Sequence, residues 1–326
     1  MKTIADAANE LGVTKTTISR ALSGKGRVGE ETRRKVLDWV KQNNYTPNSI
    51  ARSLAERKTY NIAVVLPKNA DNLFFQKCLI GIAETIVKEG YDTVTVIDYG
   101  DDISSIERII KNQKVDGVII TRTVEHDKIL EYLKKADIPY LVIGTISDES
   151  IFQVDVNHTQ ASCDITRNFL NRGITKIALI SGGKEYPVNK CRYDGFKKAF
   201  EMENIPFSNA QVFWDVWTDS DIHAAKILKQ LADKDIQAIA CTDSALCQRV
   251  INALHRKDIK FKKNIKIFNF YEGKDDLVFF DDSYPVSSVC VDTLELSHAS
   301  GENMLALLKN KEVPFKTLIP YTLKIK

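Results

Sequence analysis

The segment over residues 4–23, IADAANELGVTKTTISRALS, constrains the fold most, because its small and branched residues have the spacing of two helices joined by a tight turn. Two helices that cross steeply leave room only for a methyl group, which Ala8 provides. The turn needs a backbone that tolerates a positive φ, and Gly12 supplies it. Ile18 then fills the crevice between the helices. The segment therefore predicts a helix-turn-helix.

Local capping signals mark both helix starts: Thr3 with Asp6 three residues later for the first helix, and Thr14 for the second. The second helix separates a polar face from an apolar face. The polar side chains are those of Lys15, Thr16, Thr17, Ser19 and Arg20. Any amphipathic helix has such a face, but this one follows a helix-turn-helix spacing and carries donors suited to bases and phosphates. We predict that it enters the major groove of DNA.

The charge distribution supports this prediction. Residues 1–60 contain 12 Lys and Arg against 6 Asp and Glu, whereas residues 61–326 contain 34 against 37. The basic excess therefore lies at the N-terminal end, as expected for a region that meets phosphates, because counterion release drives the sequence-independent part of DNA affinity. A length of 326 residues fits a small head joined to a body of one or two lobes.

A third helix is predicted over residues 32–43, where Val36, Trp39 and Val40 share one face. Trp39 could stack on a nucleic-acid base, but its helical spacing with two valines favours the core of a three-helix head. Pro47 ends this unit.

Asn48 then caps a short helix, SIARSLAE, followed by the polar linker ERKTYN. A helix of this length is marginal in water. We therefore expect this hinge to become ordered only when DNA and a partner chain hold it.

From Asn61 onward, apolar strands alternate with amphipathic helices. The first round has the strands IAVVLP, TVTVID, GVIIT and YLVIG with helices over 73–89, 104–112 and 126–135; the second has the strands KIALIS, AIAC and IKIFNF with helices over 160–171, 191–203, 220–232 and 245–257. Continuous apolar strands between helices predict parallel sheets covered on both faces. Two such rounds predict two similar lobes, with a ligand cleft at the carboxyl ends of the strands.

Other site classes find little support in the sequence. The cysteines, which lack CxxC spacing and paired histidines, predict reduced core thiols and neither a zinc site nor a redox motif; they are Cys78, Cys163, Cys191, Cys241, Cys247 and Cys290. We expect no cofactor. The first residues, MKTIADAANE, do not form a signal peptide, and no segment approaches the roughly 20 apolar residues of a membrane span, so we expect a cytosolic protein.

Over nearly its whole length the chain resembles the lactose and galactose repressor family of bacterial transcription factors. TIADAANELGVTKTTISRAL is similar to the DNA-reading head of that family, ETRRKVLDWVKQNNYTPNSIARSLA to its third helix and hinge, and NLFFQKCLIGIAETIVKEGY to the start of its sugar-binding-protein-like body. The resemblance implies a homodimer on a pseudo-palindromic operator. The sequence ends at YTLKIK without the added heptad helix by which some family members join two dimers, so we expect a dimer.

The domain boundaries that follow are a helix-turn-helix head at 1–46, a hinge helix and linker at 47–60, and a two-lobed body at 61–326. The body resembles periplasmic binding proteins. Its first lobe is expected to comprise residues 61–156 and 287–317, and its second lobe residues 157–286 and 318–326.

The resemblance also implies DNA contacts. Lys15, Thr16 and Arg20 would read base edges, and arginine suits guanine through a bidentate contact. The residues that would position the DNA backbone are Thr3, Thr14, Thr17, Thr32, Asn48 and Arg52. In the family, each hinge helix inserts one leucine into the central base step, and the corresponding leucine here is Leu54. Such a wedge unstacks and kinks the duplex. The alternative is that Leu54 only packs in the dimer.

Effector contacts are implied in the body. They would come from Phe74, Phe75, Arg192, Trp217, Thr242 and Asp243, with Tyr271 beside them. Aromatic rings stack on the apolar faces of sugars, while arginine and carboxylate groups bind hydroxyls. Structural alternatives remain open: Phe74 or Phe75 belongs to the core, Trp214 replaces Trp217 as the exposed aromatic, and Asp243 only caps a helix.

The chain departs from the family pattern at three places. Thr242-Asp243 stands where the family usually has Asn-Asp, the stretch 269–272 reads NFYE where it usually has Gly-Phe-Asp-Asp, and Gly144-Thr145 stands where sugar binders often have Asp-Arg. Several hydroxyl-binding groups are therefore missing. The effector could be a larger or modified sugar or a non-sugar metabolite, or the cleft could have lost its ligand. Tyr271 indicates a more aromatic, less charged cleft.

We therefore predict a DNA-binding transcriptional regulator, a repressor whose operator affinity is controlled by a small, sugar-like effector between two lobes. Control by a protein corepressor that docks on the body is an alternative. A periplasmic sugar-binding protein would need a signal peptide and would lack the first 60 residues. An enzyme would need a nucleophile with a base or a metal cluster, whereas the five histidines are dispersed singly and SGGKEYP lacks P-loop spacing.

Overall fold

The computed structural model of the chain describes residues 2–23, 26–45, 53, 56–68, 70, 73–216, 221–261, 264–274 and 283–326. The chain forms two compact units, Met1–Thr59 and Tyr60–Lys326. Asn48, Arg52 and Leu54 of the expected hinge lie outside the described residues, as does Trp217. The first unit is called the head below, and the second the body.

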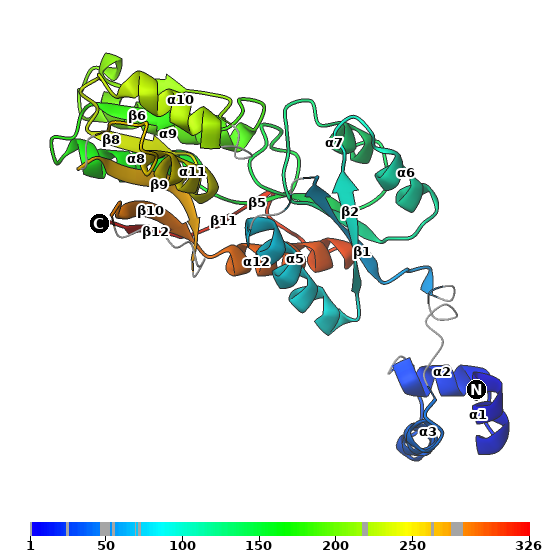
Figure 1. Cartoon of the computed structure of the whole chain (residues 1–326). Coiled ribbons are helices and arrows are strands. Elements are labelled where there is room, and N and C mark those ends of the chain that lie inside the picture. The colour runs from blue at the N-terminus through cyan, green and yellow to red at the C-terminus, as the bar shows by residue number, and fades with distance from the viewer. Residues whose placement is uncertain are drawn as a thin grey trace. The chain divides into compact units, whose positions relative to one another are not determined.

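The head contains helices α1 (Ile4–Leu11), α2 (Lys15–Ser23) and α3 (Glu30–Gln42). Figure 1 shows them grouped at the N-terminal end of the chain. Their shared core is formed by Ala7, Ala8, Ile18, Ala21, Val36 and Trp39. Trp39 is only 5% exposed, so the prediction that it belongs to the core is confirmed.

The turn between α1 and α2 has the predicted geometry. Gly12 ends α1 with φ of 64° and ψ of 31°, the left-handed conformation that costs a glycine little. Ala8 is 7% exposed where the two helices meet, and Ile18 is fully buried. The helix-turn-helix predicted from these three residues is therefore confirmed.

The first sheet of the body is parallel throughout. Its strand order is β11 (Lys316–Ile319), β5 (Gln153–Val156), β4 (Tyr140–Ile143), β3 (Gly117–Ile120), β1 (Asn61–Pro67) and β2 (Asp92–Asp98). One face is covered by α5 (Leu73–Ile86) and α12 (Thr293–Leu308), and the other by α6 (Ser104–Lys111) and α7 (Lys128–Leu133), as Figure 1 shows. A short 3-10 helix, η1 (Val87–Glu89), follows α5.

Strand β1 explains why the sequence is apolar without a break. Ile62 and Val64 join the core under α5 and α12, whereas Ala63 and Val65 join the core under α6 and α7. Successive side chains of a strand point to opposite faces, so a strand covered on both faces has no polar side.

The second sheet has the order β12 (Tyr321–Lys324), β10 (Val286–Val291), β9 (Lys266–Gly273), β8 (Ala238–Cys241), β6 (Ile177–Ile180) and β7 (Gln211–Phe213). Helices α8 (His158–Leu170) and α9 (Pro187–Met202) cover one face, and α10 (Asp221–Leu231) and α11 (Ser244–Leu254) the other. A 3-10 helix, η2, spans Phe207–Asn209. The strands are parallel except for β12, which runs antiparallel to β10 at the edge.

Three expectations need correction. The helix expected over 191–203 begins at Pro187, because proline at the first helical position has a suitable φ and no amide hydrogen to leave unpaired. The expected first-lobe segment 287–317 includes most of β10, yet β10 pairs with β9 in the second sheet. The segment 318–326, expected in the second lobe, includes the end of β11, which pairs with β5 in the first sheet.

The described chain therefore crosses between the lobes at three places. It leaves the first lobe between β5 and α8, returns between β10 and α12, and leaves again between β11 and β12. Asp292 marks the second crossing, since its side chain caps α12 by accepting the amide hydrogen of Glu295.

The two sheets repeat one strand order. β2-β1-β3-β4-β5 in the first lobe corresponds to β7-β6-β8-β9-β10 in the second. In the first lobe the chain runs from β1 to β2 on one side and then crosses to β3 on the other side of β1; β6, β7 and β8 repeat this in the second lobe. Such a reversal of strand order opens a crevice beyond the carboxyl ends of the strands. The predicted fold class, a helical head with a two-lobed α/β body, is confirmed. No helix among the described residues is long and apolar enough to cross a membrane.

Candidate nucleic-acid interface and interlobe cleft

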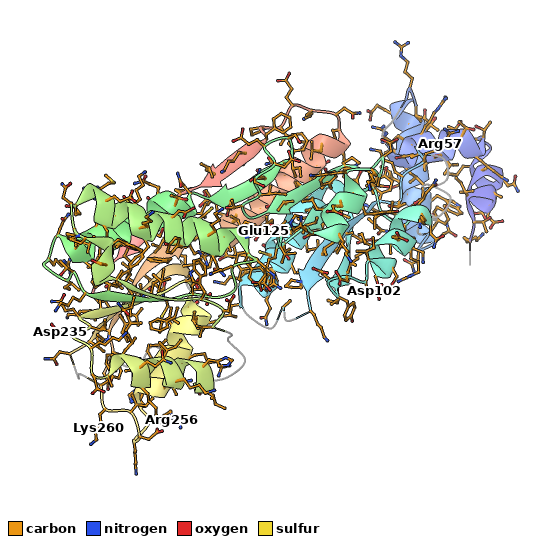
Figure 2. All side chains as sticks on the ribbon, turned by 90° about the horizontal axis from the view of Figure 1, so that it is seen from above. Arg57, Asp102, Glu125, Asp235, Arg256 and Lys260 are labelled. Atoms are coloured by element: carbon orange, nitrogen blue, oxygen red, sulfur yellow. The ribbon has the colours of Figure 1, made fainter. Side chains whose placement is uncertain are left out.

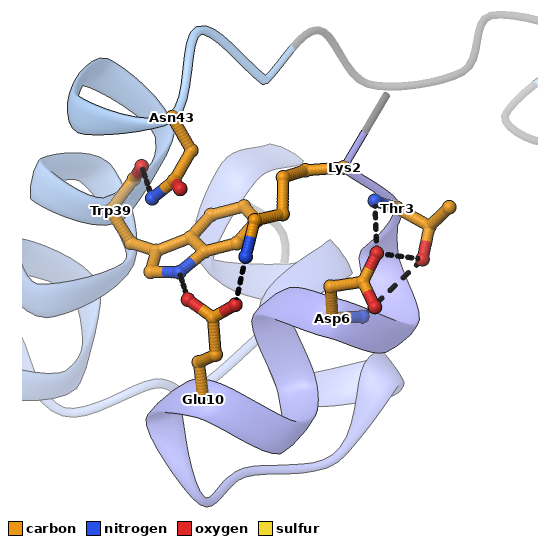
Figure 3. Close-up of polar contacts among 6 residues, drawn as sticks. All are labelled: Lys2, Thr3, Asp6, Glu10, Trp39 and Asn43. Carbon is orange, nitrogen blue, oxygen red and sulfur yellow. Dashed lines mark hydrogen bonds and ion pairs between the residues drawn. The ribbon is translucent and has the colours of Figure 1, made fainter.

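The start of α1 is fixed by a reciprocal pair of caps. The Thr3 backbone amide donates to Asp6 Oδ2 at 2.8 Å, and the Asp6 amide donates to Thr3 Oγ1 at 3.3 Å, as Figure 3 shows. The Thr3 hydroxyl donates to the same carboxylate at 2.8 Å. These hydrogen bonds lower the pKa of Asp6. Thr3 is exposed, but its hydroxyl already serves the helix start.

Glu10 joins α1 to α3. Trp39 Nε1 donates to Glu10 Oε2 at 2.7 Å, and Lys2 forms an ion pair with the other carboxylate oxygen (Figure 3). The bonds from Lys2 and Trp39 lower the pKa of Glu10. Trp39 thus buries its ring and satisfies its one donor, which fixes the angle between the two helices.

Helix α2 presents the predicted reading face. Its start is capped by Thr14, whose Oγ1 accepts the Thr17 amide hydrogen at 3.1 Å, and the two hydroxyls lie 2.9 Å apart. Lys15, Thr16 and Arg20 are exposed, whereas Thr17 is half-buried. Three of the predicted contact residues therefore share an exposed helix face, and Thr17 supports that face through the cap. Thr32 is half-buried on α3.

Arg20 depends on the loop after α2. Gly26 has φ of 89°, and a Cβ atom there would lie 3.2 Å from Arg20 Cδ. The aliphatic part of Arg20 therefore passes close to the Gly26 backbone. A glycine at this position both permits the left-handed turn and leaves room for the arginine.

In the body, the predicted aromatic residues meet across the lobes. Phe74 of α5 lies 5.6 Å from Tyr271 of β9, ring centre to ring centre, in an edge-to-face arrangement. Phe75 lies 5.1 Å from Phe74 but is only 4% exposed and belongs to the core. The structural alternative therefore holds for Phe75, whereas half-buried Phe74 contacts the opposite lobe.

Arg192 of α9 lies beside the same tyrosine. Its guanidinium carbon is 5.3 Å from the centre of the Tyr271 ring, and the Tyr271 hydroxyl is 2.9 Å from Thr293 Oγ1. Arg192 is 7% exposed, and burial lowers its pKa although Asp243, Tyr271 and Asp155 act in the opposite direction. A planar, nearly buried cation against an aromatic ring is suited to hold a polar ligand in a fixed orientation.

Thr242 and Asp243 have structural roles at the end of β8. Thr242 is fully buried, and its Oγ1 accepts the Gly182 amide hydrogen at 3.3 Å. Asp243 caps α11 by accepting the Leu246 amide hydrogen at 2.9 Å. The helix-cap alternative is thus observed for Asp243, while its charge still acts on Arg192. Trp214, the alternative aromatic, is half-buried and lies 5.2 Å from Tyr193.

Two further groups at the strand ends were not predicted. Asp155, near the end of β5, is 3% exposed and lies 3.1 Å from His158 Nε2, and it also accepts a short hydrogen bond from Thr145. His158, the first residue of α8, is 6% exposed. Asp155 lies near the carboxyl end of β5, as Tyr271 lies near that of β9, so its place at a strand end was the available signal.

A second unpredicted contact joins the loops after β3 and β6. Arg122 lies over the rings of Tyr186, at 4.5 Å, and Phe75, at 5.8 Å. The Glu125 amide donates to the Glu185 carbonyl at 2.9 Å. In Figure 2, Glu125 lies where the two lobes meet. Phe74 with Tyr271 and Arg122 with Tyr186 are thus two contacts between the lobes.

Two surface hollows lie elsewhere, near the crossings that flank α12. Their volumes are about 420 and 570 Å³, and they share Lys274, Asp292 and Glu295. Lys274 and Asp292 form an ion pair of 3.1 Å. The lining is of mixed charge and includes no predicted effector residue.

The cysteines form no disulfide. Cys78, Cys163, Cys241 and Cys247 are buried, whereas Cys191 and Cys290 are half-buried. Burial raises the pKa of the Cys78 thiol to about 12. Within the described part of the chain, no three His, Cys, Asp or Glu side chains are grouped closely enough to hold a metal ion.

Comparison with known proteins gives one consistent family. The model described as bacterial regulatory proteins, lacI family, matches residues 3–48, and that described as periplasmic binding proteins and sugar binding domain of LacI family matches residues 59–326. The chain is 29% identical to the HTH-type transcriptional regulator MalR of Streptococcus pneumoniae, over 98% of each chain. It is 28% identical to catabolite control protein A of Priestia megaterium, over 82% of each.

Solved structures share the fold. The lac repressor dimer bound to operator and the anti-inducer ONPF has a TM-score of 0.81 at 20% identity, covering 99% of this chain and 98% of that one. The complex of the transcriptional regulator CelR with cellobiose has a TM-score of 0.69 at 19% identity, covering 100% and 99%. The names of these relatives describe transcriptional regulators and repressors. Since the two family models together account for the head and the body, the chain belongs to the LacI family of bacterial regulatory proteins.

Proposed function

We propose that the chain is a transcriptional repressor that binds a pseudo-palindromic operator as a homodimer and responds to a small ligand between its lobes. The observation that carries the DNA-binding part is the exposed face of α2, where Lys15, Thr16 and Arg20 stand on a helix fixed by the Thr14 cap and by buried Ile18. As a DNA-binding protein, it would act in the bacterial cytoplasm.

In this proposal Lys15, Thr16 and Arg20 read base edges in the major groove. Residues that position the DNA backbone are Thr3, Thr14, Thr17, Thr32, Asn48 and Arg52. Leu54 would be the wedge that kinks the central base step. Operator bending by wild type and Leu54→Ala can be measured from the mobility of circularly permuted DNA fragments. Reduced bending in the variant would support the wedge, and unchanged bending would exclude it.

The homodimer is supported by an apolar stripe on α5 and η1. Leu73, Ile80 and Val87 are 42, 51 and 60% exposed at intervals of seven residues, so they lie on one side of the helix. An isologous dimer pairs the same surface of both copies. Ile80→Asp should give a monomer in sedimentation experiments, whereas Ile222→Asp, at a similarly exposed isoleucine of α10, should leave the dimer intact.

The effector would bind in the cleft between the lobes. The residues proposed to contact it or to shape its site are Phe74, Phe75, Arg192, Trp217, Thr242, Asp243 and Tyr271. The CelR structure contains cellobiose, and the family model that matches the body is described as a sugar binding domain, which supports a sugar-like ligand here. Stacking on Phe74 and Tyr271 and polar contact with Arg192 fit such a ligand.

Control of operator binding would follow from lobe closure. Phe74 with Tyr271, and Arg122 with Tyr186, join the two lobes, so a ligand between them changes the balance of open and closed bodies. A ligand shifts such an equilibrium only by its different affinity for the two states. The state with higher operator affinity would align the two hinge helices of the dimer.

The test selects DNA sequences from a random pool with the full-length protein and then measures affinity for the selected site. Arg20→Ala should weaken affinity for the selected site about 10- to 100-fold, the loss expected for a bidentate base contact. Lys41→Ala removes the same charge from an exposed position of α3, so it should lose far less. Failure to enrich any sequence, or equal losses in the two variants, would contradict the proposed reading face.

A further inference from the structure

The surroundings of Tyr271 contain buried polar atoms whose hydrogen bonds the protein does not satisfy. His158 Nδ1 and Arg192 Nε are buried and have no hydrogen-bond partner. Both side chains lie around one ring: the His158 ring centre is 6.2 Å and the Arg192 guanidinium carbon 5.3 Å from the centre of the Tyr271 ring. Buried polar atoms without partners are rare, because each costs free energy. Two of them beside one aromatic ring indicate a ligand position.

The protonation of His158 determines what this position offers. Its Nε2 lies 3.1 Å from the Asp155 carboxylate, so Nε2 carries the hydrogen and Nδ1 the lone pair. Burial lowers the pKa of His158, the positive charge of Arg192 adds to that effect, and Asp155 opposes it. Near neutral pH, His158 therefore presents an acceptor at Nδ1, next to a donor at Arg192 Nε.

An acceptor beside a donor matches a hydroxyl group, which donates one hydrogen bond and accepts others. A phosphate or carboxylate has only acceptor oxygens when ionised, so it could satisfy Arg192 but not His158. The buried charges also disfavour an anion, because Asp155 already offsets Arg192 and Asp243 lies nearby. A phosphate ester would add a charge of about −2 to this site.

We propose that one hydroxyl of the effector bonds to both His158 Nδ1 and Arg192 Nε, and that this subsite selects uncharged, polyhydroxylated ligands over their phosphate esters. The proposal rests on the effector cleft proposed above and assigns His158 as a specificity-determining residue. Asp155 and Thr145 are positioning residues, because they hold the His158 ring in the required tautomer.

Two substitutions of His158 separate ligand contact from a purely structural role. His158→Gln keeps a donor near the Nε2 position, and therefore the Asp155 contact, but removes the acceptor at Nδ1. His158→Asn keeps a polar group near the Nδ1 position and removes the Asp155 contact. Titration calorimetry would use the full chain with glucose, maltose and cellobiose and with the 6-phosphates of these sugars.

We expect at least one neutral sugar to bind more tightly than its phosphate. His158→Gln should weaken that binding about tenfold, the effect of one hydrogen bond, whereas His158→Asn should change it less. A larger loss of sugar affinity in His158→Asn than in His158→Gln would show that His158 has a structural role and would overturn the proposal. Preference for a phosphate, or binding of no neutral sugar in the panel, would also overturn it. Thermal melting of each variant verifies that the body is folded.

A pH series gives an independent readout. The groups that face His158 are Asp155 from β5, Arg192 from α9, Tyr271 from β9 and Lys316 from β11. Protonation converts Nδ1 from an acceptor to a donor, so wild-type affinity should fall as pH drops below the ordinary histidine range, about 6.5. His158→Gln should lack this fall. A pH-independent wild-type affinity would contradict the proposal.

This result can be separated from failure of the proposed function. Operator binding without ligand does not involve His158, so His158→Gln should bind the selected operator as the wild type does. If sugar binding behaves as expected while no operator is found, the subsite stands and the regulator proposal fails. If operator binding is normal while His158→Gln binds sugar like the wild type, the subsite fails alone.

Discussion

The head and the body cleft build their candidate sites in different ways. The proposed reading face of α2 comes from one continuous segment, and the cap at its start joins residues only three apart, Thr14 and Thr17. The candidate effector site brings together Phe74, Arg192 and Tyr271, which lie on three different elements and come from both lobes. A local site can be recognised from a short motif, whereas a distributed site exists only once the strand order brings its parts together.

The two regions also differ in how their cores are organised. The head has one small core, centred on Ile18 and Trp39. In the body, one core includes residues of both lobes, such as Ile62 of β1 and Phe196 of α9. We therefore expect the head to unfold independently of the body, and the lobes of the body to unfold together. The following variants test this contrast.

The largest effect is expected in the body. Phe268 is fully buried and stacks on Phe169 with ring centres 4.3 Å apart. Phe268→Ala should lower the free energy of body unfolding by about 3–5 kcal/mol, through lost burial and the cavity that remains. Calorimetric melting should show a lower body transition and an unchanged head transition. Phe315→Ala, at a 53% exposed phenylalanine, is the control; a fall in both transitions for Phe268→Ala would refute independent units.

The corresponding change in the head is Ile18→Ala. Ile18 fills the gap between α1 and α2 with no exposed surface, so its truncation should cost about 2–5 kcal/mol of head stability. Nuclear magnetic resonance spectra of the full chain should lose the dispersed head signals while the body signals persist. Leu37→Ala, on the exposed side of α3, should leave the head folded. A folded Ile18→Ala head would show that Ile18 is not the central packing residue.

A smaller effect is expected at the loop after α2. Gly26→Ala forces a side chain into φ of 89° and places its Cβ against Arg20 Cδ. The cost of a left-handed non-glycine residue is roughly 1–2 kcal/mol. We expect lower head stability in urea titrations and weaker operator binding. Gly29→Ala is the control, because Gly29 has ordinary φ of −58° and no neighbour within 4 Å of an added Cβ. Equal effects of the two variants would remove the role given to Gly26.

The smallest effect concerns pH. Hydrogen bonds from Lys2 and Trp39 lower the folded-state pKa of Glu10, and those from Thr3 lower that of Asp6. A carboxyl with a lowered folded pKa contributes stability above its unfolded value, about 4.3 for Glu, and loses it as pH falls through the folded value. The melting temperature of the head should therefore decrease below about pH 4.5. In Glu10→Gln this decrease should be smaller. An identical profile in Glu10→Gln would exclude the Glu10 contribution.

The same contrast explains what the sequence could predict. Ala8, Gly12 and Ile18 have roles that depend on neighbours a few residues away, so their spacing was sufficient. Strand β10 was placed in the wrong lobe, because its pairing with β9 depends on topology and not on its own composition. The sheets of the body were predictable because β1 and β6 are apolar on both faces.

The cleft was predicted only in part. Arg192 and Tyr271 lie close together, whereas Asp243 caps a helix and Phe75 lies in the core; their contacts with an effector stay a prediction. Asp155 and His158 carry no motif of their own. The two residues are only three apart, and their contact depends on how the chain turns between β5 and α8.

In the proposed mechanism, a ligand between the lobes controls how tightly the head binds its operator. The direct test is fluorescence anisotropy of the selected operator, titrated with full-length protein with and without a sugar found by calorimetry. We expect the sugar to change operator affinity by about 5- to 150-fold, the usual range of coupling between sites, and Arg192→Ala to abolish this change. A sugar that saturates its site but leaves operator affinity unchanged would contradict the mechanism.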